Sequence, residues 1–243
     1  MVGTGIRVEA QGDESMIWHV AKRMGVVLAV ALLAACSDDG EGGGKTDGGT
    51  STDGGTNATK SLAPGLGFSR EAPLGQAFTL PAGLTLENPI VAYSPENPVD
   101  CDDKYSDEAK GTGEEVRVCL IFNNTTNAPI TVTLPPGLIL VSTNDDVQNG
   151  IIVQTVSIVV PPGERYFAPM FAYCVNENRS TTGNDDRYEL GPTVQHKDFQ
   201  DMFSLLAGKD ISKEEAARIQ SVVDHVAQGE GLSAADRATL QGM

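Results

Sequence analysis

Hydrophobic residues follow three successive patterns along this chain. An uncharged apolar run occupies residues 25–35, runs rich in β-branched residues lie between residues 62 and 175, and hydrophobic residues at helical spacing begin at Phe199. Apolar residues that alternate with polar ones predict strands, whereas apolar residues three or four apart predict helices. The chain is therefore expected to hold a leader, a β-rich region and a helical tail, in that order.

Turn sequences divide the β-rich region. Pro135-Pro136-Gly137 and Pro161-Pro162-Gly163 have the chemistry of type II turns, because proline sets the first φ and glycine accepts a positive second φ. Runs of strand composition lie around these turns, at residues 116–122, 130–134, 138–141, 151–160 and 165–175. Strands of this length and spacing favour a β-sandwich. Pro169 inside the last run predicts an edge or a bulge there.

The tail predicts three short helices. Phe199 opens an apolar stripe with the i, i+3, i+4, i+7 spacing of a helix. Capping boxes open the next two helices, with Ser212 three residues before Glu215 and Ser233 three residues before Asp236. Helices this short are unstable alone in water, so they are expected to pack on the strands or on each other.

These elements predict one domain over residues 61–243. Residues 61–190 are expected to be mainly β and residues 191–243 helical, because the hydrophobic period changes between them. We therefore expect an α+β fold in which an immunoglobulin-like β-sandwich is followed by short C-terminal helices. The Cys…Trp…Cys signature of true immunoglobulin domains is absent, since the one tryptophan, Trp18, lies in the leader.

The leader has the parts of a secretory signal. Lys22 and Arg23 precede the apolar run, and small residues precede Cys36. The run of 11 residues is shorter than the about 20 that a membrane-spanning helix needs. Both Met1 and Met16 remain candidates for the start, because residues 16–23 alone make an ordinary basic region.

Leu33-Ala34-Ala35-Cys36 resembles the lipobox of bacterial lipoproteins. In that family the signal peptide is cleaved before the cysteine, whose sulfur carries a diacylglycerol. The resemblance implies a signal peptide at residues 1–35 and a lipid anchor on Cys36. Because Ser37 follows the cysteine where inner-membrane lipoproteins tend to carry Asp, it also implies an outer-membrane location, facing the periplasm or the exterior. An ordinary signal peptide with an incidental cysteine is the alternative.

Residues 36–60 are expected to form a disordered linker. They are rich in Gly, Thr, Ser and Asp and hold no large apolar residue, so they cannot offset the entropy of ordering. Such a linker spans about 27 Å on average. The formal net charge of the chain is −16, which repels nucleic acid and excludes it as a partner.

Candidate catalytic residues are few. His196 and His225 are the histidines after the leader, and no hydrolase, zinc-protease or phosphate-loop motif accompanies them. The expectation is a non-enzymatic module, bound to the membrane through its lipid, that binds a protein or a glycan or supports the envelope. An enzyme of unrecognised type is the last-ranked alternative. The polar loops at residues 100–113 and 176–187 are where a β-sandwich would carry that binding. No cofactor is expected, apart from Ca²⁺ as described next.

Acidic residues crowd one loop and suggest a calcium site. Asp100, Asp102, Asp103 and Asp107 offer the hard oxygen ligands that Ca²⁺ prefers. The EF-hand pattern is not met, because Lys104 occupies a ligand position and no glycine follows it. A solvated acidic loop is the alternative.

Three further cysteines follow Cys36, at positions Cys101, Cys119 and Cys174. Export places them in an oxidising compartment, so one pair and one remaining thiol are expected. Cys119–Cys174 would join two strands, whereas Cys101–Cys119 would hold the long acidic loop to the strand after it. The second pairing is slightly favoured, because that loop is otherwise unsupported.

Tyr173-Cys174-Val175 and residues 219–223, Ile-Gln-Ser-Val-Val, resemble the two half-motifs of bacterial thioester adhesin domains. In that family a cysteine and a glutamine condense with loss of ammonia, and the thioester captures an amine of the host. The resemblance implies Cys174 and Gln220 as the reacting pair of a covalent adhesin. The aromatic residue that usually follows the glutamine is absent here, and an ordinary helix-surface glutamine is the alternative.

Overall fold

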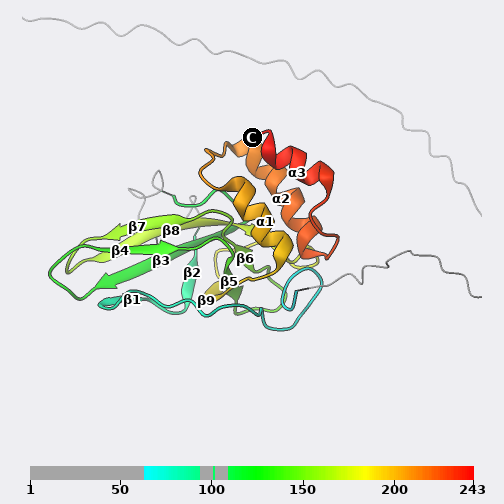
Figure 1. Ribbon diagram of the computed structural model, residues 1–243. Helices are drawn as coiled ribbons and strands as arrows, with labels where there is room; N and C mark the ends of the chain where they lie inside the picture. The colour runs from blue at the N-terminus through cyan, green and yellow to red at the C-terminus, as the bar shows by residue number, and fades with distance from the viewer. Residues whose placement is uncertain (1–62, 94–100, 102–108) are drawn as a thin grey trace, which may run out of the picture. The chain divides into compact units, whose positions relative to one another are not determined.

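The computed structural model describes residues 63–93, 101 and 109–243 (Figure 1). Cys36, the signal peptide predicted at residues 1–35 and the linker predicted at residues 36–60 lie outside this part of the chain. The elements of the described residues are, in chain order, β1 (Leu84–Leu86), β2 (Ile90–Ala92), β3 (Val116–Asn124), β4 (Ile130–Leu134), β5 (Leu138–Ser142), β6 (Gly150–Ile151), β7 (Val156–Val160), β8 (Arg165–Cys174), β9 (Arg187–Thr193), α1 (Lys197–Leu206), α2 (Lys213–Ala227) and α3 (Ala234–Gln241).

Six strands close into an antiparallel barrel. Around the ring the order is β3, β2, β9, β5, β6 and β8, and a direct pairing of β8 with β3 completes it. The ladder between β3 and β8 is long, and it runs from Val116 opposite Ala172 to Asn123 opposite Arg165. At one end of this ladder β1 pairs with the same edge of β3 as β2 does, with Leu86 opposite Phe122. β4 and β7 form a separate two-stranded sheet.

The predicted immunoglobulin-like β-sandwich is therefore wrong. The predicted strands form, except that the run at residues 151–160 divides into β6 and β7. The architecture differs because alternating burial is the same in sandwiches and barrels, and closure depends on which strands pair. Here the short β2 pairs with both β3 and β9, and β9 pairs with β5, which closes the ring. Because β9 continues to Thr193, the β part also extends past the predicted boundary at residue 190.

Alternate residues of the long strands fill the barrel. One buried cluster holds the inward side chains, among them Val116, Val118, Leu120 and Phe122 of β3 and Ala168, Met170, Ala172 and Cys174 of β8. The inward residues of β8 include two alanines, which suits the narrow space that six strands enclose. The inward residues of β4 and β7, such as Val132 and Ile158, belong to the same cluster. The two-stranded sheet therefore covers one side of this core.

The turns form as the sequence predicts. The Leu138 N–H donates to the Pro135 carbonyl at 3.3 Å, and Gly137 has a φ of 86°. Gly163, at the end of the second Pro-Pro-Gly sequence, has a φ of 67°. A positive φ at the glycine is the feature on which the prediction of a type II turn rested.

At Pro169, β8 is paired with β3 along one edge, and β6 does not extend far enough to pair with the other edge. The Pro169 carbonyl accepts a hydrogen bond from the Lys110 N–H at 2.8 Å, on the side away from β3. The N–H that proline lacks would point to that same side, because both polar groups of a strand residue face one neighbour. The ladder with β3 therefore loses no hydrogen bond, and the edge character predicted for Pro169 is confirmed.

The three helices pack on the outer face of β5, β6 and β8 (Figure 1). Ile139 of β5 and Tyr173 of β8 point outward and join a second buried cluster with the helical stripe that Phe199 opens. The predicted capping boxes of α2 and α3 are both present. Their amphipathic stripes are buried against a sheet face that is itself apolar, which explains how such short helices are held.

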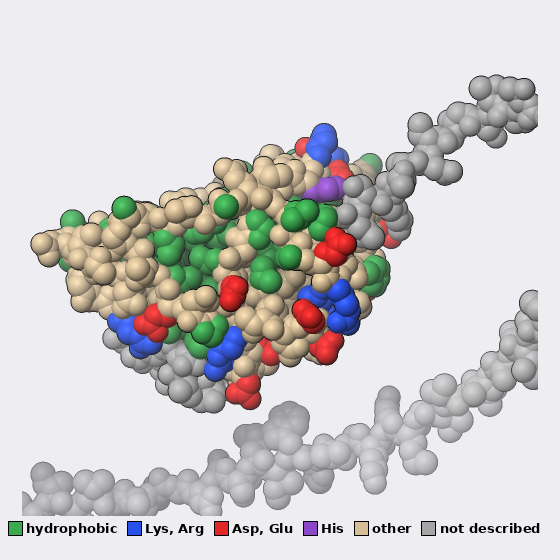
Figure 2. Space-filling model, turned by 90° about the horizontal axis from the view of Figure 1, so that it is seen from below, with side chains coloured by type: hydrophobic (Ala, Val, Ile, Leu, Met, Phe, Trp, Pro, Cys, Tyr) green, Lys and Arg blue, Asp and Glu red, His purple; other side chains and the backbone are tan. Residues whose placement is uncertain are grey.

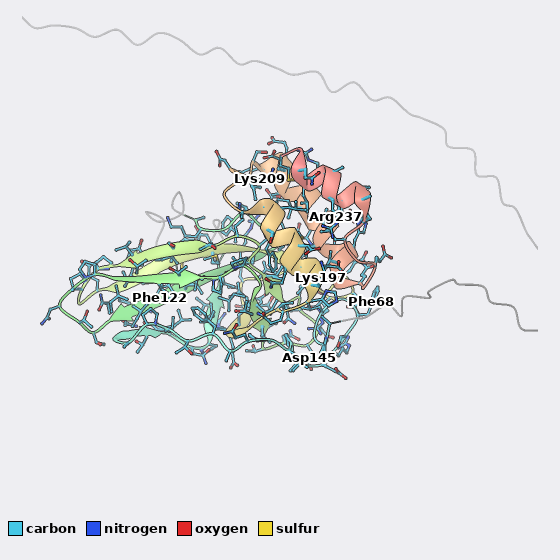
Figure 3. All side chains as sticks on the ribbon, viewed as in Figure 1. Phe68, Phe122, Asp145, Lys197, Lys209 and Arg237 are labelled. Atoms are coloured by element: carbon cyan, nitrogen blue, oxygen red, sulfur yellow. A yellow bond between two sulfur atoms is a disulfide. The ribbon has the colours of Figure 1, made fainter. Side chains whose placement is uncertain are left out.

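Polar contacts also join the helices. Asp201 of α1 accepts hydrogen bonds from Lys197 at 2.7 Å and from Arg237 of α3 at 2.8 Å (Figure 3). These hydrogen bonds hold the pKa of the Asp201 carboxyl below its usual value. Lys209 donates to the Met243 carbonyl at 2.8 Å and so fixes the end of the chain.

Among the described residues, none of the helices combines the length and the hydrophobicity that a membrane span needs.

Hydrophobic side chains of the core are exposed on the face of the molecule that Figure 2 shows. Figure 2 shows hydrophobic side chains gathered in a hollow of this face, with acidic and basic side chains beside it. Partly buried hydrophobic residues pack against the barrel cluster at Phe78, Leu80, Leu86, Ile130, Tyr166 and Leu190. The strands and turns around the barrel therefore cover its core incompletely.

Candidate functional site

Cys174 and Gln220, the two residues of the thioester resemblance, are neighbours in the structure. The Gln220 Oε1 accepts a hydrogen bond from the Cys174 main-chain N–H at 3.0 Å. The Gln220 Nε2 donates to the Cys174 carbonyl at 3.0 Å and to Asp224 Oδ1 at 2.8 Å. The contact thus joins a side-chain amide of α2 to the main chain of β8.

The end of β3 explains this contact. The strand begins at Val116 opposite Ala172, so no β3 residue lies opposite Cys174. The N–H and C=O of Cys174 would otherwise lack a strand partner, which is costly at a largely buried position. The Gln220 side chain offers one donor and one acceptor, as a peptide group does. It therefore continues the hydrogen bonding of the sheet for one more residue.

The Cys174 thiol belongs to the barrel-interior cluster, where the residue is 4% exposed. Burial raises the pKa of the thiol far above its usual value, and Glu115 and Asp224 raise it further. A buried thiol that stays protonated is a poor nucleophile. The arrangement therefore favours a structural role for the pair. Intact-mass measurement distinguishes the two roles, since a thioester lowers the mass by that of one ammonia.

Replacing Gln220 with alanine should reduce the free energy of unfolding by about 1–3 kcal/mol, because two main-chain groups of Cys174 lose their partner. Denaturant titration of the purified protein measures this loss. Ser221→Ala, at an exposed position on the same helix, serves as the control and should change stability by less than about 0.5 kcal/mol. Equal stability of the two variants would contradict the role assigned to Gln220.

Cys101 and Cys119 form a disulfide across a sequence separation of 18 residues, and Cys174 remains a thiol. This is the pairing that the sequence slightly favoured. Cys101 and Cys119 are both buried, in a small cluster with Tyr93 and Ile121 on the outer face of the barrel. The bond therefore ties residue 101 to the middle of β3.

The calcium ligands predicted at Asp100, Asp102, Asp103 and Asp107 lie outside the described residues. Within residues 63–93, 101 and 109–243, no group of three or more His, Cys, Asp or Glu side chains could hold a metal ion. The calcium site stays a prediction.

The two histidines take up positions at helix ends. His196 is the N-cap residue of α1, and its side chain makes no capping hydrogen bond. The His225 Nδ1 lies 3.1 Å from Asp236 Oδ1 and joins α2 to α3. In the part of the chain that the structure describes, neither imidazole is hydrogen-bonded to a serine, threonine or cysteine side chain. They therefore form no nucleophile–base pair there.

Four hollows follow one another through shared lining residues, and together we call them the groove. Their volumes are about 380, 290, 140 and 260 Å³ in order along the groove. Gln154 and Thr155 line both the first and the second hollow, and Tyr173 lines both the second and the third. Glu114 and Glu115 line both the third and the fourth. Shared lining residues thus make the hollows neighbours.

Two glycines allow one wall of the groove to lie flat on β8. A Cβ on Gly111 would lie 2.2 Å from the Phe171 carbonyl oxygen, and one on Gly113 would lie 2.1 Å from the Ala172 carbonyl oxygen. Any larger residue would therefore push this segment off the strand. The Phe171 N–H donates to the Lys110 carbonyl at 2.8 Å and holds the segment in place.

The groove only partly matches the loops that the sequence proposed for binding. Its lining includes residues 109–112 of the first predicted loop, residues 114–115 just after that loop, and residues 181, 182 and 184 of the second. Sequence reasoning missed residues 152–157 and the α2 residues that line the groove. The Gly-Thr-Gly sequence at 111–113 is the signal that could have indicated a segment lying against another strand.

No family model matches this chain, and neither a curated protein nor a solved structure matches it. The features that bear on function are the sequence around Cys36 and the groove.

Proposed function

We propose that the protein is a lipid-anchored module of the bacterial outer membrane, facing the periplasm or the exterior, which binds a partner in the groove without catalysing a reaction. The anchor in this proposal is the lipid on Cys36, which follows from the lipobox resemblance. The linker at residues 36–60 gives the domain its reach from the membrane. The groove is the single observation that carries the binding role.

The walls of the groove support this role because the core fixes them. Ile152 and Val153 are each 2% exposed and Tyr173 is 1% exposed, so their positions are set by packing. The Tyr173 hydroxyl also donates to the Thr112 carbonyl at 3.1 Å, which ties one wall to the other. A concave surface with fixed walls is the usual form of a binding site, because little entropy is lost when a partner is ordered against it.

A photo-crosslinking residue at Ala217 tests the proposal in living cells. Ala217 is exposed and lines the third hollow, so we expect one discrete adduct in the envelope fraction. The same residue at Leu74, which is 67% exposed and lies outside the four hollows, should give no such adduct. Gel analysis of the cross-linked protein reports both.

Cys36→Ser supplies the second arm of this experiment. Without the acylated sulfur the protein should leave the membrane fraction, because the remaining chain is acidic and strongly hydrated. A Cys36→Ser protein that still fractionates with the membrane contradicts the anchor. Identical adduct patterns at Ala217 and Leu74 contradict the groove.

A further inference from the structure

The second hollow of the groove is the one whose lining holds the most apolar side chains. Its volume is about 290 Å³, and it is lined by Ile152, Val153, Val156 and Phe171, and also by Lys110, Tyr173 and smaller residues. Its two walls are the segment between β6 and β7 and the segment at residues 109–112. An aliphatic side chain that enters it leaves water for an apolar surface, which favours binding.

The neighbouring part of the groove is acidic. Glu114 and Glu115 are exposed and line the third and fourth hollows, and neither forms an ion pair with another described residue. Asp224 lies close by, since its carboxylate accepts a hydrogen bond at 2.8 Å from Gln220, which lines the third hollow. Burial, followed by the charges of Glu177 and Glu115, raises the pKa of the Asp224 carboxyl. Arg117 also lines the fourth hollow, whereas the lining of the third hollow holds the two glutamates and no lysine or arginine. Negative potential is therefore concentrated in the third hollow, where a cationic group would relieve it.

The aromatic rings beside the groove do not offer the flat, open faces on which sugars stack. Phe171 stacks on Tyr93, with ring centroids 6.1 Å apart. The Arg117 guanidinium lies over the same Phe171 ring, 5.4 Å from its centroid. Tyr173 is 1% exposed. Protein side chains already use these rings, which favours a peptide over a glycan as the ligand.

We propose that the groove binds an extended segment of a partner protein in which a lysine or arginine follows or precedes an aliphatic residue. The cationic side chain lies against Glu114 and Glu115, and the aliphatic side chain enters the hollow beside Phe171. Four hollows that adjoin one another in succession suit an extended chain better than a compact ligand. The net charge of −16 attracts such a segment at long range and raises its association rate. This inference rests on the proposed binding function and names the partner class for it.

The test uses the full-length lipidated protein in detergent and a fluorescent decapeptide of alternating lysine and valine as the probe. Glu114→Lys with Glu115→Lys should weaken binding by about tenfold or more, because two attractive charges become repulsive. The control is Glu71→Lys with Glu164→Lys, two exposed positions outside the four hollows. It changes the net charge equally and should weaken binding by less than about threefold.

A third variant, Ala217→Trp, fills the third hollow without changing charge and should also weaken binding. It keeps the test decisive if the double glutamate variant does not fold. Equal weakening by the groove and control variants would show general charge attraction and overturn the inference. Binding of a fluorescent chito-oligosaccharide that Ala217→Trp abolishes, while the peptide is unaffected, would overturn it in favour of a glycan. In either case a discrete adduct at Ala217 in cells would leave the binding function standing.

Discussion

Phe122→Ala is expected to lower the free energy of unfolding by about 3–5 kcal/mol. Phe122 is fully buried on β3 (Figure 3), opposite Leu86 of β1 and Tyr166 of β8. The side chain therefore packs where three strands meet beyond the short β2. Removing the ring leaves a cavity that the surrounding strands cannot fill, since each is held by the hydrogen bonds of its neighbours.

Denaturant and thermal unfolding measure this effect, and the melting temperature should fall by about 10 °C. Phe122→Leu retains most of the volume and should cost clearly less, about 1–2 kcal/mol. Val159→Ala is a control on β7 at a residue that is 57% exposed, and it should cost less than about 1 kcal/mol. A loss for Phe122→Ala as small as that of Val159→Ala would contradict the packing described for β3.

Removal of the disulfide by Cys101→Ala with Cys119→Ala is expected to cost about 3 kcal/mol. The bond closes a loop of 18 residues, and opening it increases the conformational entropy of the unfolded chain by roughly that amount. The native state also loses contacts, because both cysteines pack in the cluster with Tyr93 and Ile121. The largest part of the loss is therefore expected from the unfolded state.

Unfolding by denaturant under non-reducing conditions measures the difference, and a reductant should bring the unaltered protein to the stability of the double variant. Cys174→Ala is the matched control, since it removes a buried thiol and no disulfide. It should cost about 1 kcal/mol and, because it keeps the Cys101–Cys119 bond, it should lose as much stability in reductant as the unaltered protein does. Peptide mapping that joins Cys119 to Cys174 would contradict the pairing.

Local features of the fold follow from the sequence because each depends on neighbouring residues. Gly137 takes the positive φ that its position in Pro-Pro-Gly predicts. Ser212 and Ser233 cap their helices through the glutamate and the aspartate three residues later. The buried stripe of α1 is the one that the spacing from Phe199 predicts. These are interactions within one turn or one helix, which the order of residues alone determines.

The site was predictable only in part. The resemblance that singled out Cys174 and Gln220 found two residues that are in contact, although the contact is between an amide and the main chain. The register of β3 against β8 decides this, because Ala172 is the last β8 residue that pairs with β3 and Cys174 lies beyond it. Glu114 and Glu115 gave no signal in the sequence, since two adjacent acidic residues are common on solvated surfaces. Their candidate role in binding follows only from the tertiary structure, in which they line two neighbouring hollows.

By itself, the sequence predicted the longer strands, the turns and the helices, but it did not predict β1, β2 or β9. It also contains Leu33-Ala34-Ala35-Cys36, whose resemblance to a lipobox is the basis for proposing membrane anchoring. The barrel was decided only by tertiary structure, because a strand with one buried face can pair in either architecture and β2 and β9 select closure. The groove has the same origin, since its walls come from segments that are distant in sequence and meet only when the ring is complete. Short-range patterns fix local conformation, and the pairing of distant strands fixes shape.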